Sequence, residues 1–110
     1  MEMSAPWISV VKTVLDGDDS IVKNYPGKSE NKTGYLVITK KKLVFVNEKG
    51  LFRKSYELVW DEPLNNVKEL EQVDRYKIKL NDGDKTYEVE TGELNSKIVL
   101  NAIEEVKANH

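Results

Sequence analysis

The segment RYKIKLNDGDKTYEVE, residues 75–90, constrains the fold most strongly, because two alternating runs of residues flank a turn sequence. Alternation of apolar and charged residues is typical of a strand with one buried face, since successive side chains point to opposite sides. The apolar positions are Tyr76, Ile78, Leu80, Tyr87 and Val89. Asp82-Gly83 favours the positive φ angles of a type I′ turn. We therefore expect residues 75–80 and 85–90 to pair as an antiparallel hairpin over a core.

Strand-like composition continues towards the N-terminus. Pro26-Gly27 is expected to end the first of these segments, and Glu48-Lys49-Gly50 to turn the third into the fourth. The expected strands span residues 21–25, 35–39, 43–47, 52–60 and 67–70. Among the aromatic residues in this part and in the hairpin, we expect Phe45, Trp60, Tyr76 and Tyr87 to lie in the core.

A helix is expected at each end of the chain. Near the start, Ser4 is a candidate N-cap, Pro6 is tolerated in the first turn and Gly17 is a natural stop. The apolar residues of this helix are Trp7, Val10, Val11, Val14 and Leu15. A second, broader apolar stripe predicts a helix over about 94–107, for which Thr91 and Asn95 are alternative N-caps. Its apolar residues are Leu94, Ile98, Val99, Ala102, Ile103 and Val106.

These elements predict an α+β fold that is mainly β. About seven antiparallel strands would form a bent sheet or partly open barrel, and the C-terminal helix would cap its open end. At 110 residues the chain is expected to be a single domain over residues 1–110. Residues 1–17 would form a helical extension, and residues 20–108 would form the core of the domain.

Composition narrows the range of functions. The sequence contains no cysteine, which excludes disulfides, thiolate metal sites and cysteine nucleophiles. The formal charge of −2 argues against a nucleic-acid-binding protein, which usually carries a strongly basic face. We find no signal peptide and no apolar run long enough to span a membrane, so we expect a cytoplasmic protein.

No arrangement of residues typical of an active site is present. The only histidine is His110, and neighbouring carboxylates such as Asp61-Glu62 fit a solvated surface better than a catalytic pair. Residues 16–20 begin like a calcium loop, but Ile21 and Gly27 stand where glycine and glutamate are required. We therefore expect a non-enzyme without cofactor or metal. An enzyme of unknown type remains an unfavoured alternative.

Two segments resemble the pleckstrin-homology (PH) superfold. Residues 34–45, GYLVITKKKLVF, resemble the pattern G-x-L-x-apolar-T, three polar residues and L-x-F of GRAM-like and prokaryotic PH-like domains. Residues 63–70, PLNNVKEL, resemble the step that follows the fourth strand in those families. The resemblance covers roughly residues 20–108 and implies a binding or adaptor module.

The resemblance also implies candidate sites. A headgroup site between the loops after strands one, three and six would use a patch of Lys23, Lys28, Lys32, Lys49, Arg53 and Lys54. The acidic turn of Asp82 and Asp84 would repel a polyphosphate there, so we favour a protein or peptide partner over an anionic membrane surface. The implied peptide groove, along the edge of strand five and the C-terminal helix, consists of Val67, Lys68, Leu70, Lys97, Asn101 and Glu104.

The three consecutive lysines Lys40, Lys41 and Lys42 allow two interpretations. We expect them to be a solvent-exposed turn that discourages pairing with other strands. The alternative is a weak anion patch, in which each lysine would add about 1 kcal/mol of attraction to an anionic membrane.

Overall fold

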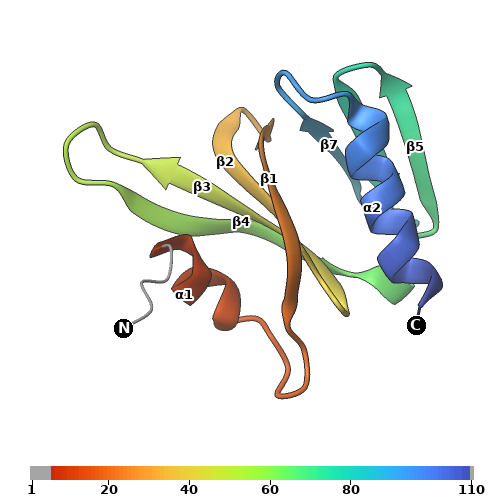
Figure 1. The fold of residues 1–110 in the computed structure, drawn as a ribbon, viewed down its shortest axis with the longest axis horizontal. Helices are drawn as coiled ribbons and strands as arrows, with labels where there is room; N and C mark the ends of the chain where they lie inside the picture. The colour runs from red at the N-terminus through yellow and green to blue at the C-terminus, as the bar shows by residue number, and fades with distance from the viewer. Residues whose placement is uncertain (1–5, 110) are drawn as a thin grey trace.

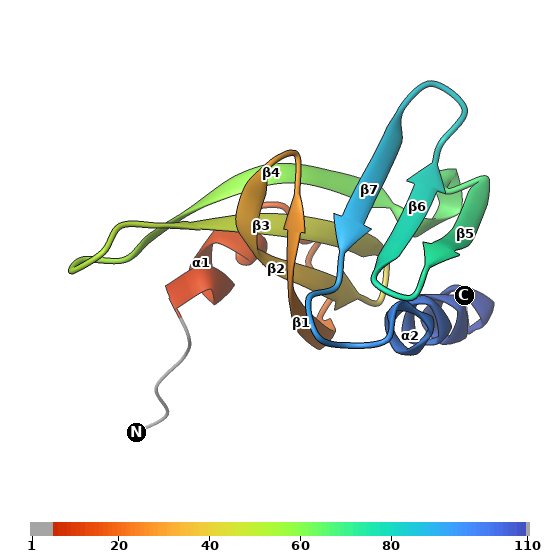
Figure 2. The ribbon, with the colours of Figure 1, turned by 90° about the horizontal axis from the view of Figure 1, so that it is seen from above.

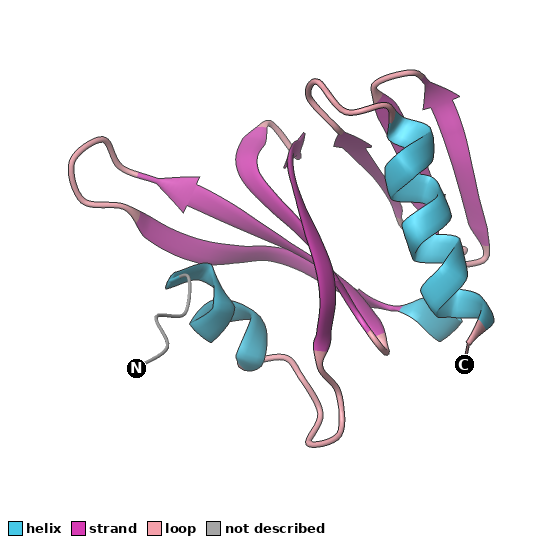
Figure 3. Ribbon diagram, viewed as in Figure 1, coloured by secondary structure: helices cyan, strands magenta, loops and turns pink. Residues whose placement is uncertain are grey.

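The computed structural model describes residues 6–109. Within this range, seven strands form one antiparallel sheet in the order β4-β3-β2-β1-β7-β6-β5, with helices at both ends of the chain (Figures 1 and 3). The elements are α1 (Pro6–Lys12), β1 (Ile21–Ser29), β2 (Lys32–Thr39), β3 (Lys42–Lys49), β4 (Ser55–Pro63), the 3-10 helix η1 (Leu64–Asn66), β5 (Glu69–Asp74), β6 (Lys77–Asn81), β7 (Thr86–Glu90) and α2 (Ser96–Ala108). The expected α+β fold with a C-terminal helix is confirmed.

The sheet bends between β1 and β7 into two halves. The two strands pair at Lys28 and Glu90, whereas each of the other neighbouring strands pairs over at least five positions. The helix α2 lies against the half formed by β5, β6 and β7, and Figure 2 shows it nearly end-on beside these strands. The main core fills the space between α2 and the inner faces of both halves, around Phe45, Ile78 and Ile103.

The strands β2 and β3 are apolar on both faces because each face has its own cover. Leu36 and Phe45 point into the main core. Val37 and Val44, which alternate with them, pack with Trp7 and Val11 of α1 in a second cluster. The helix α1 therefore covers the outer face of the sheet, which accounts for the continuous apolar runs in both strands.

The boundaries of β1 and β2 differ from the expected ones. The strand β1 continues through Pro26-Gly27 to Ser29, and the turn is formed by Glu30 and Asn31, both with positive φ of 54° and 62°. Ser29 pairs with Lys32, so this is a two-residue hairpin turn. Gly27 is needed in the strand rather than in a turn, because a Cβ atom there would lie 2.7 Å from the carbonyl oxygen of Glu90.

The predicted hairpin of residues 75–90 is confirmed, but its turn type was wrong. Asn81 pairs with Thr86, which leaves a four-residue turn, and only Gly83 in it has positive φ. The carboxylate of Asp82 accepts backbone N–H bonds from Asp84 at 2.8 Å and Lys85 at 2.6 Å. Side-chain hydrogen bonding of this kind shapes the turn in place of a type I′ geometry.

Other elements shift by several residues. The strand β4 begins at Ser55 rather than 52, and β5 spans Glu69–Asp74 rather than 67–70. Of the alternative caps for α2, Asn95 is the N-cap, and its side chain accepts from the backbone N–H of Lys97 at 3.0 Å. The helix α1 ends at Lys12, well before Gly17. The expected cap Ser4 and the single histidine His110 lie outside the described residues.

The aromatic core prediction is correct for Phe45 and Trp60, which are 0% and 7% exposed. Tyr87 is half-buried against the core, whereas Tyr76 is 50% exposed and was wrongly placed. Tyr76 lies in the turn before β6, where the strand alternation has not yet begun.

Trp60 connects the two halves of the sheet. Its ring stacks between Phe45 and Tyr87, with centroid distances of 6.1 and 4.4 Å. Its Nε1 donates to the Ser29 hydroxyl at 3.0 Å, and this hydroxyl donates to the Glu88 carbonyl at 2.7 Å. The chain of contacts therefore links β4, the end of β1 and β7.

Trp60→Ala is expected to lower the free energy of unfolding by about 3–5 kcal/mol, because it leaves a cavity and removes the hydrogen bond that the Ser29 hydroxyl accepts. Trp60→Phe keeps an aromatic ring in the stack and should cost less. Urea denaturation of both variants measures the difference. A loss below about 1 kcal/mol for the alanine variant would contradict this role for Trp60.

Candidate functional site: a groove between the first strand and the C-terminal helix

The first part of β1 has a strand partner on one side only. Residues 21–27 pair with β2, but the pairing with β7 is confined to Lys28 and Glu90 at the other end of the strand. A β-bulge between Ile21 and Lys23 also interrupts the regular register. Among the described strands, none covers this second edge of β1, so its backbone groups are available to a further extended segment.

A groove of about 440 Å³ lies between this free edge and α2. Its apolar floor includes the buried side chains of Ile38 and Ala102 and the half-buried Val106. Val22, 44% exposed, forms part of the opposite wall. The volume falls within the range of roughly 300–1,000 Å³ usual for ligand sites, which are mostly apolar with a few polar groups at the edge.

The rim of the groove carries both signs of charge. Lys23 and Lys40 are exposed on the side of the sheet, and Glu105 and Asn109 are exposed on the helix. Sequence reasoning placed Lys23 in a headgroup patch, but the structure places it here with Lys40. The groove itself was missed, because its walls come from residues 22–40 and 102–109, and only the fold brings them together.

The peptide groove expected along β5 is partly occupied by the protein's own contacts. The strand β5 does lie at an edge of the sheet. Val67, however, is only 3% exposed, and the Lys107 ammonium donates to its carbonyl at 2.6 Å. Leu70 packs partly against the core. The remaining candidates are exposed, namely Lys68, Lys97, Asn101 and Glu104.

The six residues of the expected anionic-ligand patch do not converge on one site. Lys32 and Lys49 flank the carboxylate of Glu57, at 3.7 and 3.0 Å. Hydrogen bonds from Asn47 and then Lys49 hold the pKa of Glu57 below its usual value. Lys54 pairs with Glu48 at 2.8 Å. Lys23 lies in the groove described above, and Lys28 lines a separate hollow beside Tyr76, so the set is spread over several surfaces.

The expectation of a solvent-exposed lysine turn holds for Lys40, whereas the side chains of Lys41 and Lys42 are only 39% and 18% exposed. The Lys41 ammonium pairs with Asp18 at 2.6 Å. The Lys42 ammonium, whose side chain is only 18% exposed, donates to the Val14 carbonyl at 2.7 Å and pairs with Asp61 at 3.4 Å. Both side chains therefore fasten the β2–β3 turn to the segment between α1 and β1.

Thr39 organises the same turn from within. Its hydroxyl donates to Asp19 at 2.9 Å and accepts the backbone N–H groups of Lys41 and Lys42 at 3.2 and 2.7 Å. Asp19 also accepts from the backbone of Lys41 at 3.2 Å. This network accounts for a threonine immediately before the three lysines, a position that sequence reasoning linked only to a family pattern.

Lys42→Met keeps the alkyl stem but removes the ammonium donor to Val14. We expect the free energy of unfolding to fall by about 1 kcal/mol. The matched change Lys40→Met should stay within about 0.5 kcal/mol, since Lys40 is exposed. Urea denaturation at low and high salt measures both variants. Equal values for the two would show that Lys42 is a solvated residue after all.

Two carboxyl groups, the buried Glu62 of β4 and the partly exposed Asp82 of the β6–β7 turn, form a pair. Glu62 is 5% exposed, and the Asp82 carboxyl group lies close to it. Burial, and then the contact with Asp82, raises the pKa of Glu62 to about 7. The backbone N–H groups of Lys85 and then Asp84 lower the pKa of Asp82, so Glu62 is the member of the pair that holds a proton more tightly.

This pair predicts a pH-dependent stability. Between the ordinary pKa of 4.5 and about 7, folded Glu62 retains a proton that the unfolded chain has released. The free energy of unfolding should therefore fall as pH rises through this window, by at most on the order of 3 kcal/mol. Glu62→Gln cannot ionise at this position, so it should match the wild type near pH 5 and exceed it near pH 8.

Chemical denaturation at the two pH values tests the Glu62 prediction. Glu69→Gln, at an exposed position of β5, serves as the control and should leave the pH profile of the wild type unchanged. A Glu62→Gln profile parallel to that of the wild type would mean that another group causes the pH dependence.

Residues 6–109 contain neither a metal-binding cluster nor a membrane-spanning helix. In this range no group of three or more acidic or histidine side chains is arranged to hold a metal ion. Neither α1 nor α2 has the length and apolar character that a membrane-spanning helix requires.

No protein-family model matches the chain, and no curated protein sequence matches it significantly.

Proposed function

We propose that this protein is a non-catalytic binding module with a PH-like fold, and that its ligand is an extended segment of a partner protein. The order of seven antiparallel strands followed by a helix agrees with the resemblance of residues 34–45 and 63–70 to that superfold. The observation that carries the proposal is the unpaired edge of β1 beside an apolar groove.

A peptide strand added to β1 would gain affinity from the main chain. The backbone groups of residues 21–25 on this edge would hydrogen-bond the added strand, and its alternate side chains would point into the groove. A groove of about 440 Å³ has room for only one or two apolar side chains. The ligand is therefore a short segment with a single apolar anchor rather than a long amphipathic helix.

Charge at the rim selects the residues beside that anchor. Lys23 and Lys40 face the ligand from the side of the sheet, so an acidic residue next to the anchor is favoured there. Glu105 on α2 favours a basic or neutral residue on the opposite side. The chemistry of the partner is thus an extended segment with an apolar residue flanked by at least one carboxylate.

The experiment selects ligands from a displayed library of random peptides on the complete chain. Selected peptides are then measured by fluorescence anisotropy against the wild type, Val22→Glu and Val73→Glu. Both valines lie on strands and are similarly exposed, at 44% and 48%, so both changes should leave folding intact. We expect Val22→Glu to weaken binding by roughly tenfold or more, equivalent to about 1.4 kcal/mol.

Val73 lies on the edge strand β5, so its variant tests the other available edge. Val73→Glu should leave affinity within about twofold of the wild type. The opposite result, with β5 sensitive and β1 insensitive, would place the peptide along β5 and overturn the assignment of the groove. Failure to select any peptide that Val22→Glu weakens would overturn the proposed function.

A further inference from the structure

The β3–β4 hairpin ends in a fully exposed apolar pair. Leu51 is 90% exposed and Phe52 is 100% exposed, more than any other large hydrophobic residue among the described residues. The hairpin projects away from the rest of the molecule, and its loop forms one end of the long axis in Figure 1. Neither side chain contributes to either core cluster, so the fold does not require apolar residues there.

The loop has a defined geometry at its base. Lys49 pairs with Ser55, which closes a five-residue loop over residues 50–54. Gly50 has a φ of 95°, and a Cβ atom there would lie 2.0 Å from the Arg53 carbonyl oxygen. A glycine in this conformation brings the two sides of the loop together and leaves Leu51 and Phe52 at the tip.

Cationic side chains stand directly behind the apolar pair. Lys49, Arg53 and Lys54 are all exposed, and they flank Leu51 and Phe52 in the chain. Lys49 forms a salt bridge with Glu57, and Lys54 forms one with Glu48. Arg53 makes no salt bridge within the described part of the chain, so its charge remains available at the tip.

We propose that the β3–β4 tip inserts Leu51 and Phe52 into an anionic lipid bilayer, with Arg53 and Lys54 at the level of the lipid phosphates. An apolar tip backed by cations matches the order of layers in such a membrane, with hydrocarbon inside and negative charge at the surface. A protruding tip needs no shaped pocket in a bilayer, whereas a protein partner would have to supply a deep one.

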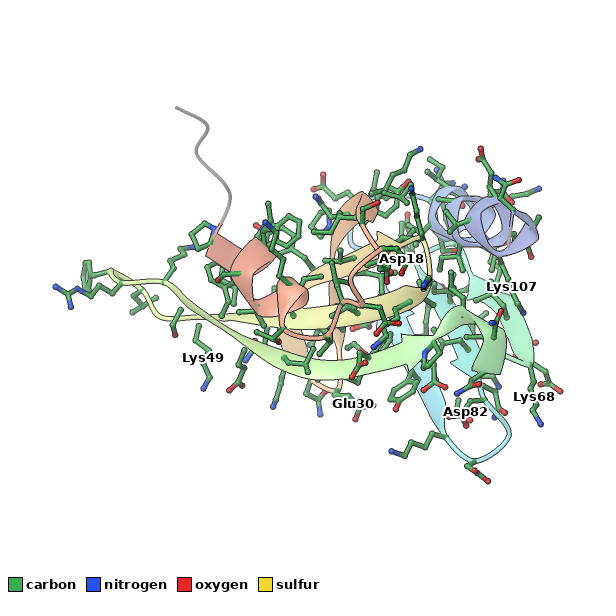
Figure 4. All side chains as sticks on the ribbon, turned by 90° about the horizontal axis from the view of Figure 1, so that it is seen from below. Asp18, Glu30, Lys49, Lys68, Asp82 and Lys107 are labelled. Carbon is green, nitrogen blue, oxygen red and sulfur yellow. The ribbon has the colours of Figure 1, made fainter. Side chains whose placement is uncertain are left out.

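The distribution of charge allows this orientation. The acidic β6–β7 turn with Asp82 lies at the opposite end of the molecule from the tip, whereas Lys49, the last residue of β3, belongs to the hairpin itself (Figure 4). A bilayer contacting the tip would therefore not face that turn, despite the net charge of −2. The groove beside β1 uses different residues, so this inference does not depend on the proposed peptide ligand.

Co-sedimentation of the complete chain with vesicles tests the insertion. The vesicles contain phosphatidylcholine alone or mixed with phosphatidylglycerol. We expect weak, reversible binding to the mixed vesicles only, as is usual for a single small anchor. The double change Leu51→Ser and Phe52→Ser should reduce binding by roughly tenfold or more. The double change Arg53→Gln and Lys54→Gln should reduce binding and should also make the remaining binding less sensitive to salt. Val73→Ser with Ile98→Ser changes two apolar residues elsewhere that are 48% and 51% exposed; this control should bind like the wild type.

A fluorescent probe distinguishes insertion from adsorption. The chain has no cysteine, so Leu51→Cys can be labelled at one position with an environment-sensitive dye while Phe52 stays in place. We expect the emission to shift to shorter wavelength on mixed vesicles. The same dye at Val73→Cys should not shift.

Three results would overturn the insertion. One is an absence of binding to mixed vesicles at low salt. A second is binding that requires Arg53 and Lys54 but survives the double serine change, which would indicate adsorption by charge alone. The third is self-association of the wild type in analytical ultracentrifugation that the double serine change abolishes, which would make the tip a contact between copies of this chain.

Discussion

Trp60 lies between the two halves of the sheet, where its indole N–H donates to Ser29 and its ring stacks on Tyr87. In the order of the sheet, β4 is three strands away from β1 and four away from β7, so these contacts can form only when the sheet bends back on itself. Backbone pairing between the halves is confined to Lys28 and Glu90. The bend therefore depends on buried side chains. The Trp60 ring provides a large buried apolar area, and its N–H hydrogen bond fixes the orientation of the ring.

Closure at one end of β1 leaves the other end open. Gly27 permits the close approach of β7 near Lys28, because any larger side chain would collide with the Glu90 carbonyl. Towards Ile21 the strands have no such contact, and α2 rather than a strand forms the opposite wall. The groove is thus a consequence of how the sheet closes. A longer β1–β7 ladder would satisfy more backbone groups and would also remove the free edge.

The periodicity of apolar residues within one segment correctly predicted individual strands and helices. The alternation around Ile78 and Leu80 indicated a hairpin, and the stripe through Val99 and Ile103 indicated α2, because these periods depend on neighbouring residues only. The errors arose where contacts with residues distant in the sequence determine the structure of a segment. The dipeptide Pro26-Gly27 is typical of a turn but lies in a strand beside β7. Lys42 follows two other lysines, which indicated a solvent-exposed turn, but its ammonium group donates to the carbonyl of Val14. No feature of either segment alone indicates these partners.

The β3–β4 tip is a different kind of exception. Alternation placed Phe52 at the start of a strand, which would give it a buried face, whereas the structure leaves it wholly exposed with Leu51. A polar loop would close this hairpin equally well, since Gly50 already supplies the positive φ that the turn needs. Two large apolar side chains in water raise the tendency of a protein to aggregate without adding to its core. Their presence beside Arg53 is therefore explained more directly by contact with an apolar phase than by the requirements of folding.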